Sequence, residues 1–199
     1  MKRRLFLGTT IGTAAIASGI ACNKENSNRN YSNVGFERPS VTENGLLAGM
    51  TLEDLRRQYE NDIFEEHFPF HNKYVVDHEY GSFIATTDHD GNHKNTNTSS
   101  SFMGRGIWCY SFLYNNLARE DKYLDTAAKV VKLIMKHQPT GDDFWPGSYN
   151  RKGEVIGSGK GNLPGDCYIA EGLAEYAKAT GENRYMNLAE ETILKTLRH

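Results

Sequence analysis

The fold is decided by a repeated stretch: residues 120–137 read EDKYLDTAAKVVKLIMKH, and residues 182–199 read ENRYMNLAEETILKTLRH. The two copies align without gaps at a shift of 62 positions. Self-similarity at a fixed spacing of this size is typical of repeat architectures. In both copies apolar residues recur on one helical face and charged residues cover the other. We therefore predict an amphipathic outer helix in each copy.

A second kind of helix precedes each copy. Residues 102–114 (FMGRGIWCYSFLY) are apolar on nearly every side, and residues 167–176 (CYIAEGLAEY) stand in the same place one repeat later. Helices of this composition are buried, so both are predicted to be inner helices. An earlier outer helix is predicted for residues 51–66, with Thr51 as its N-cap. Its apolar face would hold Leu52, Leu55, Tyr59 and Ile63.

The segments between the helices also correspond. Residues 80–83 with the turn at Asp90-Gly91, and residues 146–149 with the turn at Lys152-Gly153, each predict a short strand pair around a glycine turn. Helical hairpins that alternate in this way predict an all-α fold, an incomplete (α/α)6 toroid with short β-hairpin loops. A ring of six such hairpins needs about 360 to 390 residues. We interpret residues 49–199 as the truncated N-terminal half of such a barrel.

The first residues predict export rather than fold. A basic start at residues 1–4 is followed by a small, apolar stretch at residues 5–21, as in a secretory signal, and Arg3-Arg4 resembles the twin-arginine pattern. We interpret residues 1–22 as a lipoprotein-type export signal with Cys22 as the lipidation site, and residues 23–48 as a polar tether. Simple cleavage is the alternative. The expected location is periplasmic or cell-envelope, with membrane contact only through the lipid anchor.

Charge and cysteine content exclude several classes of protein. The 199 residues hold 23 Lys and Arg against 25 Asp and Glu, so no nucleic-acid partner is expected. Beyond Cys22, only Cys109 and Cys167 remain, both in predicted helices where buried, unpaired cysteine is common. No spacing typical of metal ligands is present, and no metal is predicted.

One stretch carries a family resemblance. Residues 105–114 (RGIWCYSFLY) resemble the N-acylglucosamine 2-epimerase and cellobiose 2-epimerase family, and residues 67–70, 81–83 and 168–181 agree with it. The resemblance covers about residues 52–197. It implies an (α/α)6 barrel that interconverts a reducing sugar at C2 without metal or redox cofactor. A small-molecule sugar is the implied partner, and a homodimer of the full-length protein is a further expectation.

The resemblance also implies roles for single residues. In this family a histidine pair removes and returns the C2 proton while an arginine stabilises the enediolate oxygen. Arg105 matches the catalytic arginine, and Tyr168 matches a tyrosine that faces the sugar. The histidines belong to inner helices of the half expected to follow this chain. The family's Lys before that tyrosine and its Gln-Ala-Phe after it are replaced by Gly165-Asp166 and 170–172, which leaves the substrate open.

Other interpretations of these residues remain open. Arg105, flanked by glycines that we expect to clear space beside it, has a structural ion pair with Asp77 or Glu79 as its alternative. The candidate substrate-binding residues are Tyr168, Trp108, Glu171 and Asp166, and Trp108 also suits core packing.

Alternative functions remain open as well. One is an α/α-toroid glycoside or uronyl hydrolase in which Asp166 and Glu171 serve as acid and base. Another is a non-catalytic fragment. None of the histidines present is a catalytic candidate: His67 and His71 bracket Pro69 at an expected helix exit, and His137 lies in a last helical turn.

Overall fold

The computed structural model describes residues 44–47 and 49–198. The predicted export signal with its lipidation site Cys22, and most of the predicted tether at 23–48, lie outside the described residues. The chain divides into two compact units, Met1–Leu52 and Glu53–His199.

Two short strands are described in the first unit. They are β1 (Leu46–Leu47) and β2 (Met50–Thr51), which pair as an antiparallel hairpin with Leu47 opposite Met50.

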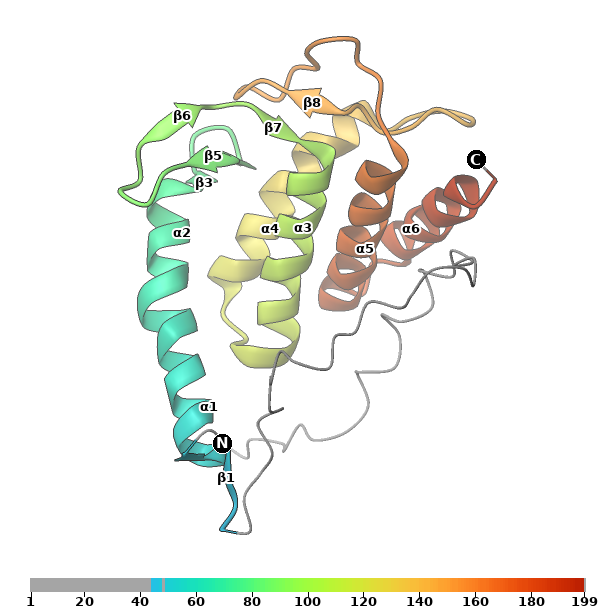
Figure 1. Cartoon of the computed structure of the whole chain (residues 1–199). Helices are drawn as coiled ribbons and strands as arrows, with labels where there is room; N and C mark the ends of the chain where they lie inside the picture. Colours follow the sequence, from blue (N-terminus) through green and yellow to red (C-terminus); the bar gives the residue numbers. More distant parts are fainter. Residues whose placement is uncertain (1–43, 48, 199) are drawn as a thin grey trace, which may run out of the picture. The chain divides into compact units, whose positions relative to one another are not determined.

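Helices make up most of the second unit (Figure 1). The predicted inner helices are confirmed as α3 and α5, and the predicted outer helices at 120–137 and 182–199 are confirmed as α4 and α6. π-Helical turns follow α1 and α3, and a 3-10 turn follows α4. The bounds are α1 (Leu52–Asn61), η1 (Asp62–His67), α2 (Phe68–Tyr74), α3 (Ser100–Phe112), η2 (Leu113–Leu117), α4 (Asp121–Ile134), η3 (Met135–His137), α5 (Leu163–Thr180) and α6 (Asn183–Thr196).

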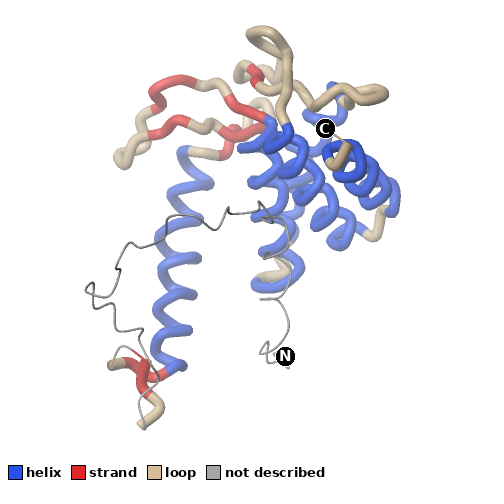
Figure 2. The backbone as a smooth tube through the Cα atoms, turned by 45° about the vertical axis from the view of Figure 1, so that its right-hand side comes forward, coloured by secondary structure: helices blue, strands red, loops and turns tan. Residues whose placement is uncertain are grey.

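The helices are arranged as successive hairpins. Figures 1 and 2 show α3 and α5 side by side, both beginning at the end of the unit that carries the loops, while α4 and α6 run back toward that end. The helix α3 packs mainly against α5 and also against α4, and α5 packs against α6. No closed barrel is formed within the part of the chain that the structure describes.

Glycines allow the two inner helices to meet closely. A Cβ on Gly104 would lie 2.4 Å from the backbone of Tyr168, and one on Gly172 would lie 2.5 Å from the carbonyl oxygen of Gly104. A Cβ on Gly106 would lie 2.0 Å from the Phe83 ring. The expectation that Gly104 and Gly106 clear space beside Arg105 is therefore wrong. They clear space for the α5 backbone and for an aromatic ring.

The core lies between α3, α5 and the outer helices. Aliphatic side chains on one side of α3 and α5 are fully buried there, but Arg105, Cys109 and Glu171 are exposed, so the predicted burial on every side is confirmed only in part. The loop that follows α4 adds two large aromatic side chains. The main buried residues are Met103, Ile107, Ile134, Ile169, Leu173, Trp145 and Tyr149.

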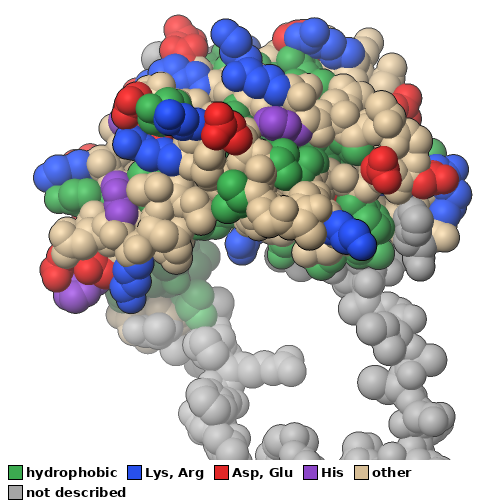
Figure 3. All heavy atoms as spheres, turned by 90° about the horizontal axis from the view of Figure 1, so that it is seen from above, with side chains coloured by type: hydrophobic (Ala, Val, Ile, Leu, Met, Phe, Trp, Pro, Cys, Tyr) green, Lys and Arg blue, Asp and Glu red, His purple; other side chains and the backbone are tan. Residues whose placement is uncertain are grey.

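Short strands gather at the end where α3 and α5 begin (Figures 1 and 2). Seen from above this end, acidic and basic side chains are interspersed on its surface (Figure 3). The antiparallel pairs are β3 (Val76–Asp77) with β4 (Ser82–Phe83), β5 (Thr86–Thr87) with β6 (His93–Asn95), and β7 (Thr98–Ser99) with β8 (Ser148–Tyr149).

The predicted strand pairs are confirmed only in part. Ser82 and Phe83 pair with Val76 and Asp77, whereas the Asp90-Gly91 turn joins β5 to β6. Around Gly153 the prediction holds, because Tyr149 bridges to Val155. The pairing of β8 with β7 was not predicted, and it ties together the loops that precede α3 and α5. Such contacts join residues far apart in sequence, so periodicity could not predict them.

The helix predicted for residues 51–66 is longer than expected and continues to Tyr74. Just ahead of Pro69 it contains the π-helical turn η1, in which the N–H of Phe68 donates to the carbonyl of Ile63 five residues back. Proline has no N–H to donate, and a π turn just ahead of it accommodates that missing donor. Tyr59 on the predicted apolar face is 63 % exposed.

None of the helices among the described residues has the length and apolar character needed to cross a membrane.

Candidate functional site

Arg105 lies on the solvent-exposed side of α3, the open side, which also carries the exposed Cys109. The helix begins at Ser100, and the hydroxyl of its N-cap Ser99 accepts from the N–H of Phe102 at 3.2 Å. The Arg105 side chain is exposed, and its Nε donates to the carbonyl of Ser101 one turn earlier at 3.3 Å. Its guanidinium carbon lies 5.0 Å from the ring centre of Tyr168 on α5 and 5.9 Å from that of Phe102.

No carboxylate within the described ranges forms an ion pair with Arg105. Its neighbours are aromatic rings and one backbone carbonyl, both of which leave most of the guanidinium N–H groups available. Cation–π contact with Tyr168 restrains the side chain without neutralising its charge. An anionic or strongly polar ligand group is the natural remaining partner.

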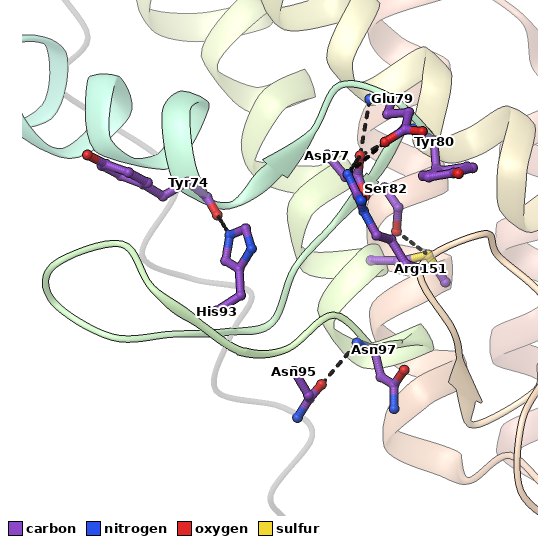
Figure 4. Close-up of polar contacts among 10 residues, drawn as sticks. Tyr74, Asp77, Glu79, Tyr80, Ser82, His93, Asn95, Asn97 and Arg151 are labelled. Carbon is purple, nitrogen blue, oxygen red and sulfur yellow. Dashed lines mark hydrogen bonds and ion pairs between the residues drawn. The ribbon is translucent and has the colours of Figure 1, made fainter.

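The structural alternative for Arg105 is wrong, because Asp77 and Glu79 bind a different arginine. Arg151 Nε lies 2.7 Å from Asp77 Oδ2, and Arg151 Nη2 lies 3.0 Å from Glu79 (Figure 4). The Asp77 side chain is only 1 % exposed and also accepts the backbone N–H groups of Glu79 and Tyr80. Sequence reasoning missed Arg151, which lies in a loop without any periodic pattern.

Opposing effects set the pKa of Asp77. Burial alone would raise the pKa of Asp77, but the hydrogen bond from Arg151 and that from the Tyr80 backbone outweigh it and hold the pKa below its usual value. Asp77 therefore stays ionised. Together with Arg151 it fixes the β3–β4 turn to the loop after β8.

The open side of the inner helices carries further candidates. Trp108 and Phe112 on α3 stack with ring centres 4.8 Å apart, and both are partly exposed. On α5, Tyr168 is partly exposed and Glu171, one turn later, is exposed. The structure thus leaves Arg105, Trp108, Tyr168 and Glu171 accessible from the same two helices.

Cys109 belongs to this open side. It was expected to be buried, but it is exposed, and Cys167 is partly exposed. Desolvation by its surroundings and the negative charge of Glu171 raise the pKa of the Cys109 thiol, while Arg105 opposes that rise. Glu171 of α5 and Arg105 of α3 thus both act on the thiol of Cys109.

Asp166 does not fit the predicted role in substrate binding. Its carboxylate is fully buried, with Oδ1 accepting the N–H of Trp145 at 2.8 Å and Oδ2 lying 2.6 Å from Lys195 Nζ. Lys195 is itself buried and donates to the carbonyl of Asp143 at 2.6 Å. This arrangement is a buried structural ion pair. A signal existed in the repeat, because Lys195 stands where the first copy has the apolar Leu133.

The described histidines all lie outside the inner helices α3 and α5. The helices α3 and α5 contain no histidine. His137 was expected to meet carbonyls of its own helix end, but its Nε2 lies 2.7 Å from the carbonyl of Gly153 in the next loop. His71 on α2 is partly buried, and that burial, followed by the neighbouring His67, lowers its pKa.

Known proteins share both sequence and fold with this chain. No family model matches it. The cellobiose 2-epimerase of Dictyoglomus turgidum is 33 % identical over 90 residues, which are 44 % of this chain and 22 % of that protein. The resemblance to cellobiose 2-epimerases is confirmed.

Solved epimerase structures agree with this result at the level of fold. The cellobiose 2-epimerase of Spirochaeta thermophila matches 71 % of this chain and 35 % of its own, with 19 % identity and a TM-score of 0.61. A sugar epimerase from a ruminal bacterium and the cellobiose 2-epimerase of Bacillus thermoamylovorans each match 71 % of this chain and 36 % of their own, with TM-scores of 0.63 and identities of 19 % and 18 %.

The comparison with cellobiose 2-epimerases confirms the predicted α/α-toroid fold class. The chain spans about a fifth of the curated epimerase that it matches and about a third of the solved ones. In a toroid of helical hairpins the inner helices border the central hollow. The exposed side of α3 and α5, which carries Arg105 and Tyr168, is therefore the candidate functional site of this chain.

Proposed function

We propose that this chain contributes one wall of the active site of a sugar 2-epimerase. The reaction is epimerisation at C2 of a reducing sugar, an N-acylglucosamine or a related aldose, by removal and return of a proton. One observation carries the proposal. Arg105, in the stretch that resembles the epimerases, is exposed on an inner helix, is stacked over Tyr168, and has no carboxylate partner among the described residues.

The chemistry of C2 epimerisation calls for such an arginine. The C2 proton of an open-chain aldose is weakly acidic, and its removal leaves an enediolate with negative charge on oxygen. A fixed cationic donor beside that oxygen lowers the barrier because it is already oriented when the charge develops. In this proposal Arg105 supplies the donor, and Tyr168 holds its guanidinium plane.

The base and the acid are proposed to come from other inner helices of the toroid. The resemblance implies a histidine pair, and α3 and α5 contain none. Imidazole suits proton transfer of this kind because its pKa lies near the operating pH. Glu171 and Trp108 are proposed to contact sugar hydroxyls and the sugar ring.

The rival function is less well supported. An α/α-toroid hydrolase would use two carboxylates flanking a glycosidic bond. Of the two candidates only Glu171 is exposed, while Asp166 is fully buried and paired with Lys195. A buried, paired carboxylate cannot reach a glycosidic oxygen, and this weighs against the hydrolase.

The decisive experiment follows the C2 proton by NMR in D2O. The protein in its natural full length is incubated with cellobiose and with N-acetylglucosamine, and we expect loss of the C2 proton signal together with the appearance of the 2-epimer. Arg105→Ala should lower kcat about 100- to 1000-fold, the usual effect of removing an oxyanion donor. Arg119→Ala is the matched control, because Arg119 also lies over a tyrosine ring, at 5.2 Å from that of Tyr114.

Two outcomes would contradict the proposal. Cleavage of a glycosidic or uronyl substrate without any C2 exchange would favour the hydrolase. Equal activity of the Arg105→Ala and Arg119→Ala variants would remove Arg105 from the chemistry.

Export is a separate proposal. We propose that the protein is a cell-envelope lipoprotein, on the support of the basic start, the apolar stretch and Cys22 in the sequence. The mature protein from membranes should carry a lipid on Cys22, visible by mass spectrometry, and Cys22→Ser should release it from the membrane fraction. An unprocessed N-terminus in wild-type cells would contradict this.

A further inference from the structure

A pair of histidines faces the same side of one helix. The continuation of the helix through Pro69 puts His67 and His71 one turn apart, with ring centres 4.8 Å apart and ring planes at 33°. Sequence reasoning placed a helix exit at Pro69, and with that exit the two imidazoles would not have been neighbours. The unbroken helix through Pro69 is thus what brings them together.

The two imidazoles differ from the other histidines that the structure describes. His78, His93 and His137 each place Nε2 at 2.7 or 2.8 Å from a backbone carbonyl, and His89 lies beside Asp90 at 3.3 Å. Within the described ranges, the side chains of His67 and His71 form no hydrogen bond or ion pair, and their ring contacts are with each other and with Phe68. Their ring nitrogens are therefore available to a ligand.

The surroundings hold the pair in place and favour a cation. Phe68, which lies between the two histidines in sequence, packs edge-on against Tyr110 and Tyr123 of the core at 5.6 and 6.0 Å between ring centres. This contact anchors the turn that carries both imidazoles. Next to it is a shallow groove of about 710 Å³, lined by Asp62, Ile63, Glu66, His67 and Phe70. Two carboxylates thus border the groove onto which His67 opens.

We propose that His67 and His71 form a two-imidazole chelate for a late transition-metal ion, with Cu²⁺ bound most tightly and Zn²⁺ less so. Histidines four positions apart on a helix lie on one face and can share one metal ion. Imidazole suits copper and zinc, and copper stands highest in the usual order of affinities.

The proposed site has only two protein ligands. In the described part of the chain no group of three or more His, Cys, Asp and Glu side chains is arranged to hold a metal. Water completes the coordination, so binding should be reversible and should not be needed for folding. A shared ion would cross-link two successive helical turns at the junction of η1 and α2, and so stabilise the helix where the proline weakens it.

Calorimetric titration of the 199-residue chain with Cu²⁺ alone tests the site. We expect one ion per chain and a rise in Tm when Cu²⁺ is added. His67→Ala should weaken Cu²⁺ binding at least about tenfold, since even outer-shell partners of a metal contribute about 10- to 100-fold. His89→Ala, which removes an exposed imidazole with a side chain that is 90 % exposed, is the matched control and should bind Cu²⁺ like the wild type.

The variants separate metal binding from folding. His67 is exposed, so His67→Ala should keep the circular dichroism spectrum of the wild type, and it decides the question even if His71→Ala fails to fold. The proposal is overturned if the wild type binds no Cu²⁺, or if the double variant His67→Ala, His71→Ala binds as tightly as the wild type. Neither result bears on the proposed epimerase, which uses a different part of the chain.

Discussion

Two regions of the molecule each place a charged side chain on an inner helix, and one charge is buried while the other is exposed. At the start of α5, Asp166 is fully buried, and its oxygens contact Lys195 and the Trp145 backbone. On the open side of α3, Arg105 is exposed; it lies over two aromatic rings, donates to a carbonyl of its own helix and forms no ion pair with any described residue. A charge that is buried and paired holds the fold together, whereas an exposed charge without a counter-ion remains available to a ligand.

The largest effect on stability is expected at the buried pair. Lys195→Met would leave the Asp166 carboxylate buried without its counter-charge, which costs about 3 to 5 kcal/mol of unfolding free energy. Chemical denaturation measures this cost. Lys132→Met on the exposed face of α4 is the control and should stay within about 0.5 kcal/mol of the wild type. A loss below about 1 kcal/mol for Lys195→Met would show that Asp166 finds another partner.

The next largest effect on stability is expected where α3 packs against α5. Gly104→Ala adds a Cβ at 2.4 Å from the Tyr168 backbone, and neither helix backbone can yield easily. In an unstrained helix the same change would stabilise by about 1 kcal/mol, but we expect a net loss of about 1 to 3 kcal/mol from overpacking. Chemical denaturation measures the unfolding free energy of Gly104→Ala, and Cys109→Ala, on the exposed side of the same helix, is the control. A stabilised Gly104→Ala would mean that α3 and α5 are not in close contact.

A smaller, pH-dependent effect is expected where Arg151 meets Asp77. Because the pKa of Asp77 is lowered in the folded state, its ionised form stabilises the fold above the unfolded value of 3.8, and this contribution is lost as pH falls through the folded pKa. Asp77→Asn should therefore cost about 1.5 kcal/mol near neutral pH and progressively less below about pH 4. If Asp77→Asn lowered the unfolding free energy by the same amount at every pH, the ion pair would be contradicted.

The smallest effect on stability is expected at Arg105. Its side chain is exposed and has no counter-ion in the described part of the chain, so Arg105→Ala should change the unfolding free energy by no more than about 0.5 kcal/mol. Thermal and chemical unfolding of the variant provide the measurement. A loss above about 2 kcal/mol would make Arg105 structural and would undo the contrast with Asp166.

Much of the fold could be predicted because its signals are local. The four helices from α3 to α6 were placed by apolar periodicity and by the repeat, which need only neighbouring residues to be read. The end of the first helix was misplaced because Pro69 normally stops a helix, and the π turn ahead of it has no sequence signature of its own.

The candidate site was predicted less completely than the fold. Arg105, Trp108, Tyr168 and Glu171 were expected to face a ligand, and all four are at least partly accessible. Asp166 was misassigned because its burial depends on a lysine 29 positions further along the chain. Arg151 was overlooked for the same reason, since its partner Asp77 lies 74 positions away.

By itself the sequence determined the kind and order of the helices, the repeat, and the resemblance that points to epimerases, because each depends on residue type at short spacing. Only the tertiary structure decided which charges are buried and which glycines mark a close helix contact. Those outcomes depend on what each side chain meets across the fold, and burial and pairing energies are set by such non-local partners rather than by the residue alone.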